Sequence, residues 1–383
     1  GRATELINDG MLSEAEELLD KALSSPQNQQ VLPLVQFWKG ELAFRSGRYD
    51  EAIRYYREYL ASGTVNGEVN PANANYNLGY AYLKKEMYAP AFTEFEKVVK
   101  LPSARSTAVE QDAFLRSADA QYMQRSYGKA DVMYDQVIRM GWAASDYASF
   151  QRAMIAGIKN SAEKIRLLQQ MQRNYASSSL VPDANLEIAN TLLSNEQFRE
   201  AIPYLNAVLK DSRSEALKPG AYLKAGIAHY NLGNNTEALS QYNTLLQQYP
   251  NSSEAEEALD NARSIYVEEG RSGEYVDFAK KMGRDISGAQ ADSLAYAEAE
   301  VQLSNGNFTN ALQRFESYLS RYPQGRYFIE ANYYKAEIHL GKKDWPKAAE
   351  AYQAVADRAP NRFGEKSLLQ AARLNFFELK NYE

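Results

Sequence analysis

The stretch NYNLGYAYLKKEMYAPAFTEFEKVV, residues 75–99, carries the pattern that decides the fold. Its apolar residues recur at the three- and four-residue spacing of an amphipathic helix on both sides of Glu86-Met87-Tyr88. The stretch therefore predicts two helices joined by a tight turn. A small residue in each helix, Gly79 and Ala91, marks the place where the two helices come closest.

The same skeleton recurs along the whole chain. With Gly79 as the anchor, a small residue follows after twelve places and a large one after sixteen, here Ala91 and Phe95. The other triplets are Gly40/Ala52/Tyr56, Ala118/Ala130/Tyr134, Ala189/Ala201/Leu205, Gly226/Ala238/Tyr242, Ala299/Ala311/Phe315 and Ala336/Ala348/Tyr352. An aromatic residue stands nine places after most anchors, at Tyr49, Tyr88, Tyr127, Phe198, Phe308 and Trp345. Two degenerate copies, Asp146 to Tyr175 and Ser253 to Met282, lack the alanine at offset twelve.

This pattern resembles the tetratricopeptide repeat (TPR), a helix–turn–helix unit of about 34 residues. The resemblance implies an all-α fold, a right-handed α-solenoid of about ten stacked repeats that are partial at both ends, in one domain over 1–383. The expected repeats are 1–29 (partial), 33–66, 72–105, 111–144, 146–179, 182–215, 219–252, 255–289, 292–325, 329–362 and 366–383 (partial). Because both ends interrupt a repeat, we expect a fragment of a longer chain. The segment 63–67 is expected to be a flexible loop.

Composition limits the classes of function. The net charge is -6, from 43 Lys and Arg against 49 Asp and Glu, and no basic run could follow a phosphate backbone, so nucleic acid is not an expected partner. No stretch approaches the 18 or so consecutive apolar residues of a spanning helix, so we expect no membrane insertion by this segment. The absence of cysteine excludes disulfides and thiolate metal sites.

The sequence offers little for catalysis. It contains no phosphate-binding glycine motif and no nucleophile elbow, so we predict no enzymatic activity, no cofactor and no metal. The two histidines, His229 and His339, each follow an anchor by three places, which favours a structural, inward-facing position over a ligand or proton-transfer role.

Other side chains lie at first-helix positions that in the resembled family usually face a concave groove. These partner-binding candidates are Phe37, Glu41, Phe44, Arg45, Tyr76, Tyr80, Lys84, Asp119, Tyr122, Asn190, Tyr230, Asn231, Tyr296, Tyr333 and Glu337. Aromatic rings beside adaptable polar groups are typical of protein and peptide interfaces. The alternative is that these rings only pack against the neighbouring repeat.

The resemblance implies a non-enzymatic protein–protein interaction scaffold that binds a peptide segment or a partner surface in its groove. Family members that clamp a chaperone tail use Lys and Asn at groove positions that here read Phe37/Glu41, Tyr76/Tyr80 and Leu115/Asp119, so that role is not expected. The pattern in Ala221 to Ser252 also resembles repeats of bacterial cell-envelope proteins associated with Tol-Pal or with outer-membrane assembly. It implies a periplasmic or outer-membrane-associated location, with the cytoplasm as the alternative. The competing function is an aromatic-lined glycan-binding protein of the outer membrane.

Overall fold

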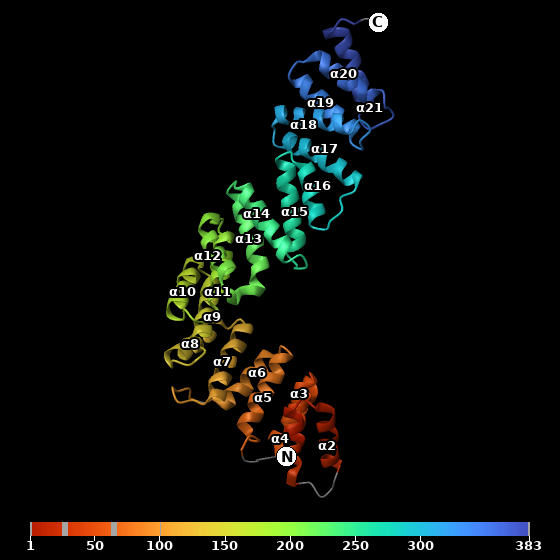
Figure 1. The fold of residues 1–383 in the computed structure, drawn as a ribbon. Helices are drawn as coiled ribbons and strands as arrows, with labels where there is room; N and C mark the ends of the chain where they lie inside the picture. Colours follow the sequence, from red (N-terminus) through yellow and green to blue (C-terminus); the bar gives the residue numbers. More distant parts are fainter. Residues whose placement is uncertain (1, 25–29, 63–66, 100, 382–383) are drawn as a thin grey trace. The chain divides into compact units, whose positions relative to one another are not determined.

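The computed structural model describes residues 2–24, 30–62, 67–99 and 101–381 (Figure 1). Most of the predicted flexible loop, residues 63–66, lies outside this set. The described residues form 21 α-helices with short helical turns between some of them, and they contain no β-strand. The prediction of an all-α fold is confirmed.

The chain forms two compact units, Gly1–Thr191 and Leu192–Glu383. Unit 1 contains α1 (Arg2–Asn8), α2 (Leu12–Ser24), α3 (Leu32–Arg45), α4 (Tyr49–Ser62), α5 (Pro71–Lys84), α6 (Tyr88–Val98), α7 (Ala108–Met123), α8 (Tyr127–Arg139), α9 (Ser145–Gly157), α10 (Ser161–Asn174) and most of α11 (Val181–Ser194). Unit 2 contains α12 (Phe198–Lys210), α13 (Lys218–Asn231), α14 (Asn235–Gln248), α15 (Ala255–Glu268), α16 (Ser272–Lys281), α17 (Gly288–Ser304), α18 (Phe308–Arg321), α19 (Phe328–Gly341), α20 (Trp345–Ala356) and α21 (Gly364–Arg373).

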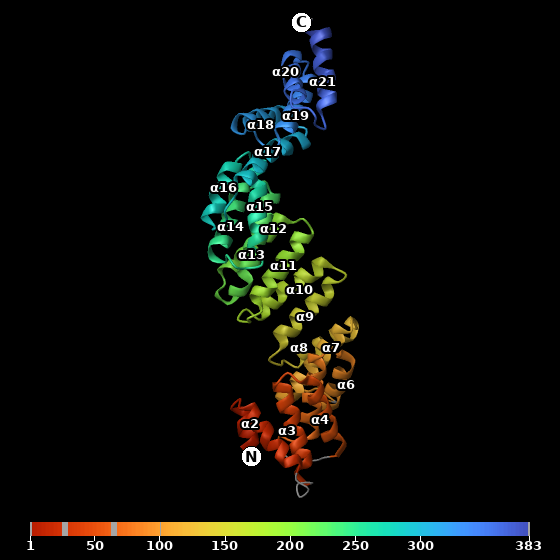
Figure 2. The same ribbon diagram turned by 90° about the vertical axis from the view of Figure 1, so that its right-hand side faces the viewer.

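Within each unit, consecutive helices pack against one another and follow each other in chain order (Figures 1 and 2). In unit 1 the hairpins α3/α4, α5/α6 and α7/α8 place their first helices side by side, and in unit 2 α13, α15 and α17 do the same. Each unit is therefore a stack of helical hairpins, as the α-solenoid prediction requires. That the repeats form one continuous domain over 1–383 stays a prediction.

The close approach of the two helices in a hairpin is set by the anchor residue. A Cβ added to Gly79 would lie 2.7 Å from the ring of Phe95, and one added to Gly226 would lie 2.2 Å from the ring of Tyr242. The predicted packing of a large residue at offset sixteen against the anchor is confirmed at these hairpins. Both rings are buried, so the anchor has no room for a side chain.

The turn inside the regular hairpins has a recurrent geometry at the residue seven places after the anchor, whereas the degenerate α9/α10 hairpin, whose turn is fully described, has no left-handed residue there. Glycine occupies this position at Gly47, Gly233 and Gly306, with φ between 73° and 75°. In other hairpins the same left-handed conformation is adopted by non-glycine residues, namely Glu86, Arg125, Glu196 and Lys343, with φ between 57° and 60°. The residue nine places after the anchor then begins the second helix, as Tyr88 begins α6.

The two degenerate repeats form hairpins as well. Asn160 caps α10 by accepting a hydrogen bond from the backbone N–H of Glu163 at 3.0 Å, which helps α10 to begin soon after α9 ends at Gly157. Leu168 and Met171 of α10 are buried, as are Tyr275 and Phe278 of α16. The second helices of both degenerate repeats therefore bury apolar side chains in the core.

Candidate functional site

The candidate residues of unit 1 lie on the first helices α3, α5, α7 and α11. At α3, the half-buried carboxylate of Glu41 accepts hydrogen bonds from Tyr56 Oη at 3.2 Å and Arg45 Nε at 2.7 Å. Asn77 of α5 reaches the same carboxylate at 3.5 Å. The Glu41 side chain is thus held by its own hairpin and by the next one.

The contact between Tyr56 and Glu41 is repeated. Tyr134 donates to Asp119 at 2.6 Å, and Tyr352 of unit 2 donates to Glu337 at 2.5 Å. In each pair the tyrosine stands sixteen places after the anchor and the acid one place after it. The tyrosine ring fills the hairpin core while its hydroxyl fixes the carboxylate of a candidate site residue. Burial and the neighbouring carboxylate together raise the pKa of each of these tyrosines.

The most connected group lies between α5 and α7. Tyr76 Oη donates to Asp112 Oδ2 at 2.8 Å, and Tyr80 Oη donates to the same oxygen. Arg116 Nε lies 3.1 Å from Tyr80 Oη and 3.3 Å from Asp112 Oδ1. We call Tyr76, Tyr80, Asp112, Arg116 and Asp119 the α5–α7 network.

Asp119 closes this network toward α9. Arg116 Nη1 donates to Asp119 Oδ2 at 2.5 Å, and Tyr147 Oη donates to Asp119 Oδ1 at 3.0 Å. Burial raises the pKa of the Asp119 carboxyl, while the hydrogen bond from Tyr134, the positive charge of Arg116 and the hydrogen bond from Tyr147 act in the opposite direction. The network holds two acids and one guanidinium, so its formal charge is negative.

Asp112 and Arg116 were not among the predicted site residues. They stand six and two places before the anchor Ala118, outside the positions used for the prediction. The spacing of Asp112, Arg116 and Asp119 at i, i+4 and i+7 places alternating charges on one helix face, and this signal could have identified them.

The aromatic candidates of unit 1 differ in exposure. Phe37 is only 3% exposed and meets Tyr56 edge-on at 5.8 Å, so it belongs to the core. Tyr76 and Tyr80 are half-buried, with ring centroids 5.1 Å apart and planes at 75°. Their rings therefore form no shared flat platform. Phe44 and Tyr122 are half-buried, each edge-on to the aromatic residue that begins the next helix.

The remaining candidates of unit 1 are polar. Arg45 and Lys84 are exposed at the ends of α3 and α5. Asn190 of α11 is half-buried, and its Nδ2 donates to Glu187 at 3.4 Å. The structure thus brings Tyr76, Tyr80 and Asp119 together in one network, whereas Asn190 is separated from them in the chain order of the hairpins.

In unit 2, two of the candidate tyrosines pack against aromatic rings of the next hairpin. Tyr296 stacks on Tyr327 with centroids 4.4 Å apart and planes at 10°, and Tyr333 stacks on Phe363 at 4.0 Å and 9°. Both candidate rings are buried, at 5% and 8% exposure. These side chains leave little surface for a partner.

The other candidates of unit 2 stay accessible. Tyr230 is 37% exposed, and its hydroxyl contacts both oxygens of Glu268 at 2.8 and 2.9 Å. Asn231 is exposed and donates to the carbonyl of Ile227 at 2.8 Å. Glu337 lies 3.1 Å from Lys366 Nζ in addition to its contact with Tyr352.

The histidines lie inside or partly inside the stacks, and His339 is buried. Its ring nitrogens make no hydrogen bond within the described residues and lie 3.5 Å from Asp344 and 3.9 Å from Glu316. Burial lowers the pKa of His339. Over the ranges that the structure describes, no three His, Asp or Glu side chains gather in a group suited to a metal.

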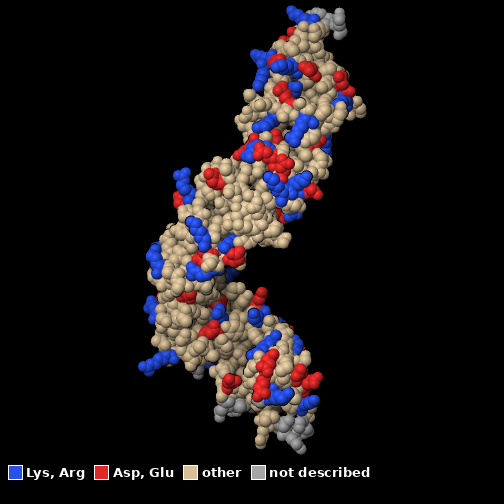
Figure 3. All heavy atoms as spheres, in the orientation of Figure 1, with Lys and Arg blue, Asp and Glu red and all other residues tan. Residues whose placement is uncertain are grey.

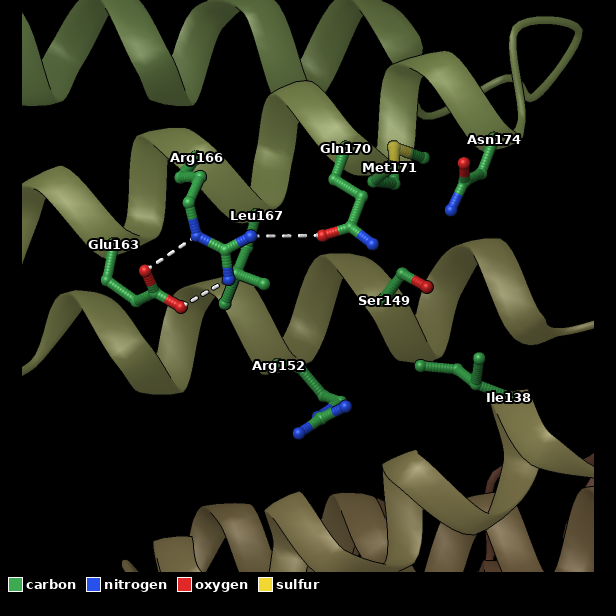
Figure 4. A pocket seen from close by; sticks show the side chains of 9 residues that line it. All are labelled: Ile138, Ser149, Arg152, Glu163, Arg166, Leu167, Gln170, Met171 and Asn174. Carbon is green, nitrogen blue, oxygen red and sulfur yellow. Dashed lines mark hydrogen bonds and ion pairs between the residues drawn. The ribbon is translucent and has the colours of Figure 1, made fainter.

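A hollow of about 320 Å³ lies between α8 and α10, over α9 (Figure 4). Its charged side chains are paired: Glu163 binds Arg166 at 2.6 Å, and Arg152 binds Asp131 at 2.8 Å and Asp135 at 2.6 Å. On the face in Figure 3, positive and negative side chains are likewise interspersed. We therefore assign no ligand to this hollow.

Comparison with known proteins identifies the repeat. A family model described as tetratricopeptide repeat matches residues 1–67, 186–253 and 296–363, more than half of the chain, and a second model of that description matches 72–104. The chain belongs to the tetratricopeptide repeat family. TPR stacks are generally non-enzymatic scaffolds that bind other proteins. Among the described TPR helices, none is long and apolar enough to cross a membrane.

Similar structures include a TPR protein from Parabacteroides merdae, with 13% identity and a TM-score of 0.40, covering 65% of this chain and 93% of that one. Another is the C-terminal part of a TPR protein from Cytophaga hutchinsonii, with 14% identity and a TM-score of 0.43, covering 87% and 99%. The transcription activator GutR of Bacillus subtilis is 28% identical over 98 residues. This match covers 26% of the TPR chain and only 12% of GutR.

Proposed function

We propose that this TPR chain is a non-enzymatic scaffold that binds a peptide segment or partner surface along the first helices of unit 1. The observation that carries the proposal is the α5–α7 network, in which aromatic, acidic and guanidinium groups are fixed before any partner arrives. Fixed side chains lose little conformational freedom on binding, so more of the interaction energy appears as affinity.

The unused hydrogen-bonding capacity of the network indicates which groups a partner would supply. Arg116 Nη2 makes no hydrogen bond within the described part of the chain, so it can donate to a partner carbonyl. The two carboxylates, Asp112 and Asp119, give this surface a negative balance that favours backbone N–H groups and basic side chains. A peptide backbone with a nearby Lys or Arg satisfies both requirements.

Site-specific photo-crosslinking tests the proposal. Lys84, exposed at the end of α5, is replaced by p-benzoylphenylalanine in the intact chain, and Lys97 on the second helix α6 is replaced in the same way as the matched control. We expect capture of a protein partner from the organism's extract at position 84 and not at 97. Capture at position 97 alone would refute binding along the first helices.

Side-chain substitutions separate the contributions of ring and hydroxyl. The double variant Tyr76→Ala/Tyr80→Ala is expected to lose the captured partner, whereas Tyr76→Phe/Tyr80→Phe keeps the rings and reports only on the hydrogen bonds to Asp112. If the alanine variant binds the partner as well as the unsubstituted chain does, the network is not the binding surface. If it instead abolishes binding to a glycan array, the glycan-binding alternative is favoured.

We also propose a bacterial cell-envelope setting, periplasmic or at the outer membrane. The proposal is supported by the pattern of Ala221 to Ser252, which resembles repeats of envelope proteins. Fractionation of the source cells, followed by immunodetection of this chain, tests it. Recovery in the cytoplasmic fraction would overturn the proposal.

A further inference from the structure

A second hollow, of about 640 Å³, lies in unit 2 between α14 and α16, at the second degenerate repeat. Sites for small ligands commonly enclose about 300–1,000 Å³. Its lining comes from α14, α15 and α16 of unit 2, whereas the proposed partner-binding surface lies on the first helices of unit 1. We call it the α14–α16 hollow.

One wall of the α14–α16 hollow is a stripe of hydroxyl and amide groups on α14. The stripe consists of Thr236, Ser240, Asn243 and Gln247, whose spacing of four, three and four residues places them on one helix face. Gln247 Nε2 donates to Asn243 Oδ1 at 3.2 Å. Groups of this kind both donate and accept hydrogen bonds.

The surface around this stripe carries little charge. From Leu232 to Ser253, Glu237 is the single charged residue. Figure 3 accordingly shows few coloured side chains over α14. A ligand that depended on ion pairs would find no partner on this wall.

The opposite wall, on α16, contains acids whose charge is balanced nearby. The guanidinium of Arg271 donates two hydrogen bonds, of 2.9 and 2.6 Å, to the carboxylate of Glu274, which holds that carboxylate in place and lowers its pKa. Asp277 makes no hydrogen bond or ion pair within the described residues, and Lys281 stands one helical turn further along the same wall. The two acids thus offer acceptor oxygens without a large net charge.

The lining between the two walls is aromatic and apolar. Tyr266 and Phe278 have ring centroids 5.7 Å apart, with planes tilted by 44°. Leu239 and Met282 complete the apolar lining. Phe278 is buried, and the Arg271 guanidinium carbon lies 5.1 Å from the centroid of the Tyr266 ring. The accessible apolar surface is therefore the half-buried part of Tyr266 together with Leu239 and Met282. The C–H groups of a sugar ring can pack on such a surface, while its hydroxyls need donors and acceptors at the sides.

We propose that the α14–α16 hollow binds a neutral oligosaccharide. The amide and hydroxyl stripe and the two carboxylates, one paired with Arg271 and one without an ion pair in the described residues, can meet the hydroxyls of a sugar, and the half-buried apolar lining can meet its C–H groups. Glu274 and Asp277 are offset by Arg271 and Lys281, so the hollow has no charge excess that would favour an ion of either sign over a neutral ligand. This site is separate from the α5–α7 network, so either one can exist without the other.

The test begins with the full chain on an array of neutral and acidic oligosaccharides, including maltotriose, cellotriose and triacetylchitotriose. Neutral members that bind are then titrated as free sugars by isothermal calorimetry. The variant Asn243→Ala/Gln247→Ala is expected to weaken binding by about ten- to a hundredfold, since each lost hydrogen bond costs about three- to tenfold. Asp277→Asn is expected to weaken it by a similar factor for one charged contact.

The matched control is Thr244→Ala/Gln248→Ala, which changes α14 one residue further along each time and leaves the hollow's lining intact. The control should bind as the unsubstituted chain does, and circular dichroism confirms that both variants fold. The proposal is overturned if no neutral sugar binds, if only acidic sugars bind, or if Asn243→Ala/Gln247→Ala binds as the control does. Capture of a peptide in the hollow in place of sugar would overturn it too.

Discussion

The left-handed residue in the turn of the regular TPR hairpins allows a direct test of how backbone conformation contributes to stability. Glu86 and Arg125 adopt φ of 57° and 60° at the position that Gly47 occupies in another hairpin. Both side chains are exposed, and within the described residues neither side chain makes a hydrogen bond or an ion pair. Replacing them with glycine therefore changes the backbone preference and little else.

The expected magnitude follows from two opposing terms. A non-glycine residue in the left-handed conformation costs about 1–2 kcal/mol. Glycine loses about 0.5–1 kcal/mol more conformational entropy on folding than alanine does. Each of Glu86→Gly and Arg125→Gly should therefore raise the free energy of unfolding by about 0.5–1 kcal/mol, and Gly47→Ala should lower it by a similar amount.

Tryptophan fluorescence during urea unfolding can measure the change in the stability of unit 1 alone once the tryptophan of unit 2 is replaced. Trp38 and Trp142 lie in unit 1, and Trp345→Phe removes the signal of unit 2. Because stacked repeats need not unfold in one step, the shift of the midpoint is compared between variants at constant slope.

A control variant tests whether a substitution to glycine stabilises unit 1 at any exposed position or only at the left-handed turn. Arg57→Gly, at an exposed position inside α4, should lower the free energy of unfolding by about 1 kcal/mol. If Glu86→Gly and Arg125→Gly destabilise unit 1 as Arg57→Gly does, the argument from the turn conformation is wrong.

Three further changes have definite expected outcomes. Gly226→Ala should destabilise unit 2 by about 1–3 kcal/mol, since its Cβ would lie 2.2 Å from a buried ring. The Cβ of Gly128→Ala would lie within 4 Å of no described atom, so this change should stabilise unit 1 by about 0.5–1 kcal/mol. Urea unfolding of the two variants measures both effects. Tyr134→Phe should cost about 1–3 kcal/mol by removing the hydroxyl that fixes Asp119, and an unchanged unfolding midpoint would contradict this. The pKa of His339 is lower in the folded chain than in the unfolded chain, so the unfolded chain binds more protons. The contribution of His339 to the free energy of unfolding is therefore fully present above about pH 6.5 and is lost as the pH falls through the folded-state pKa. In His339→Gln, the dependence of the free energy of unfolding on pH in this range should be weaker.

The sequence predicted the hairpins because their determinants are local and repeated. Gly79, Ala91 and Phe95 fix the contact between α5 and α6, and the structure has that contact at the predicted place. The turn conformation was missed because it is adopted by residues as different as Glu86 and Gly47. Because several residue types adopt this positive φ at an energetic cost, no single residue type at the turn position indicates the conformation.

The side chains of the candidate site were harder to predict, because their exposure depends on the following hairpin. Tyr296 and Tyr76 both stand three places before an anchor, yet Tyr296 is buried and Tyr76 is half-buried. The difference is the ring of Tyr327, which enters from the next hairpin and covers Tyr296. Offsets within one repeat contain no information about such a residue.

If the α5–α7 network is the partner-binding surface that we propose, its internal hydrogen bonds determine how that partner is recognised. Its hydroxyls and carboxylates already satisfy one another, so a partner group that displaced Tyr80 from Asp112 would break one hydrogen bond for each one it formed. Under that proposal, we expect the partner to add contacts without displacing existing ones, at Arg116 Nη2 and at the exposed end of α5. Specificity in such a surface arises from the fixed geometry, because a mismatched partner cannot induce the network to rearrange without leaving a half-buried carboxylate unpaired.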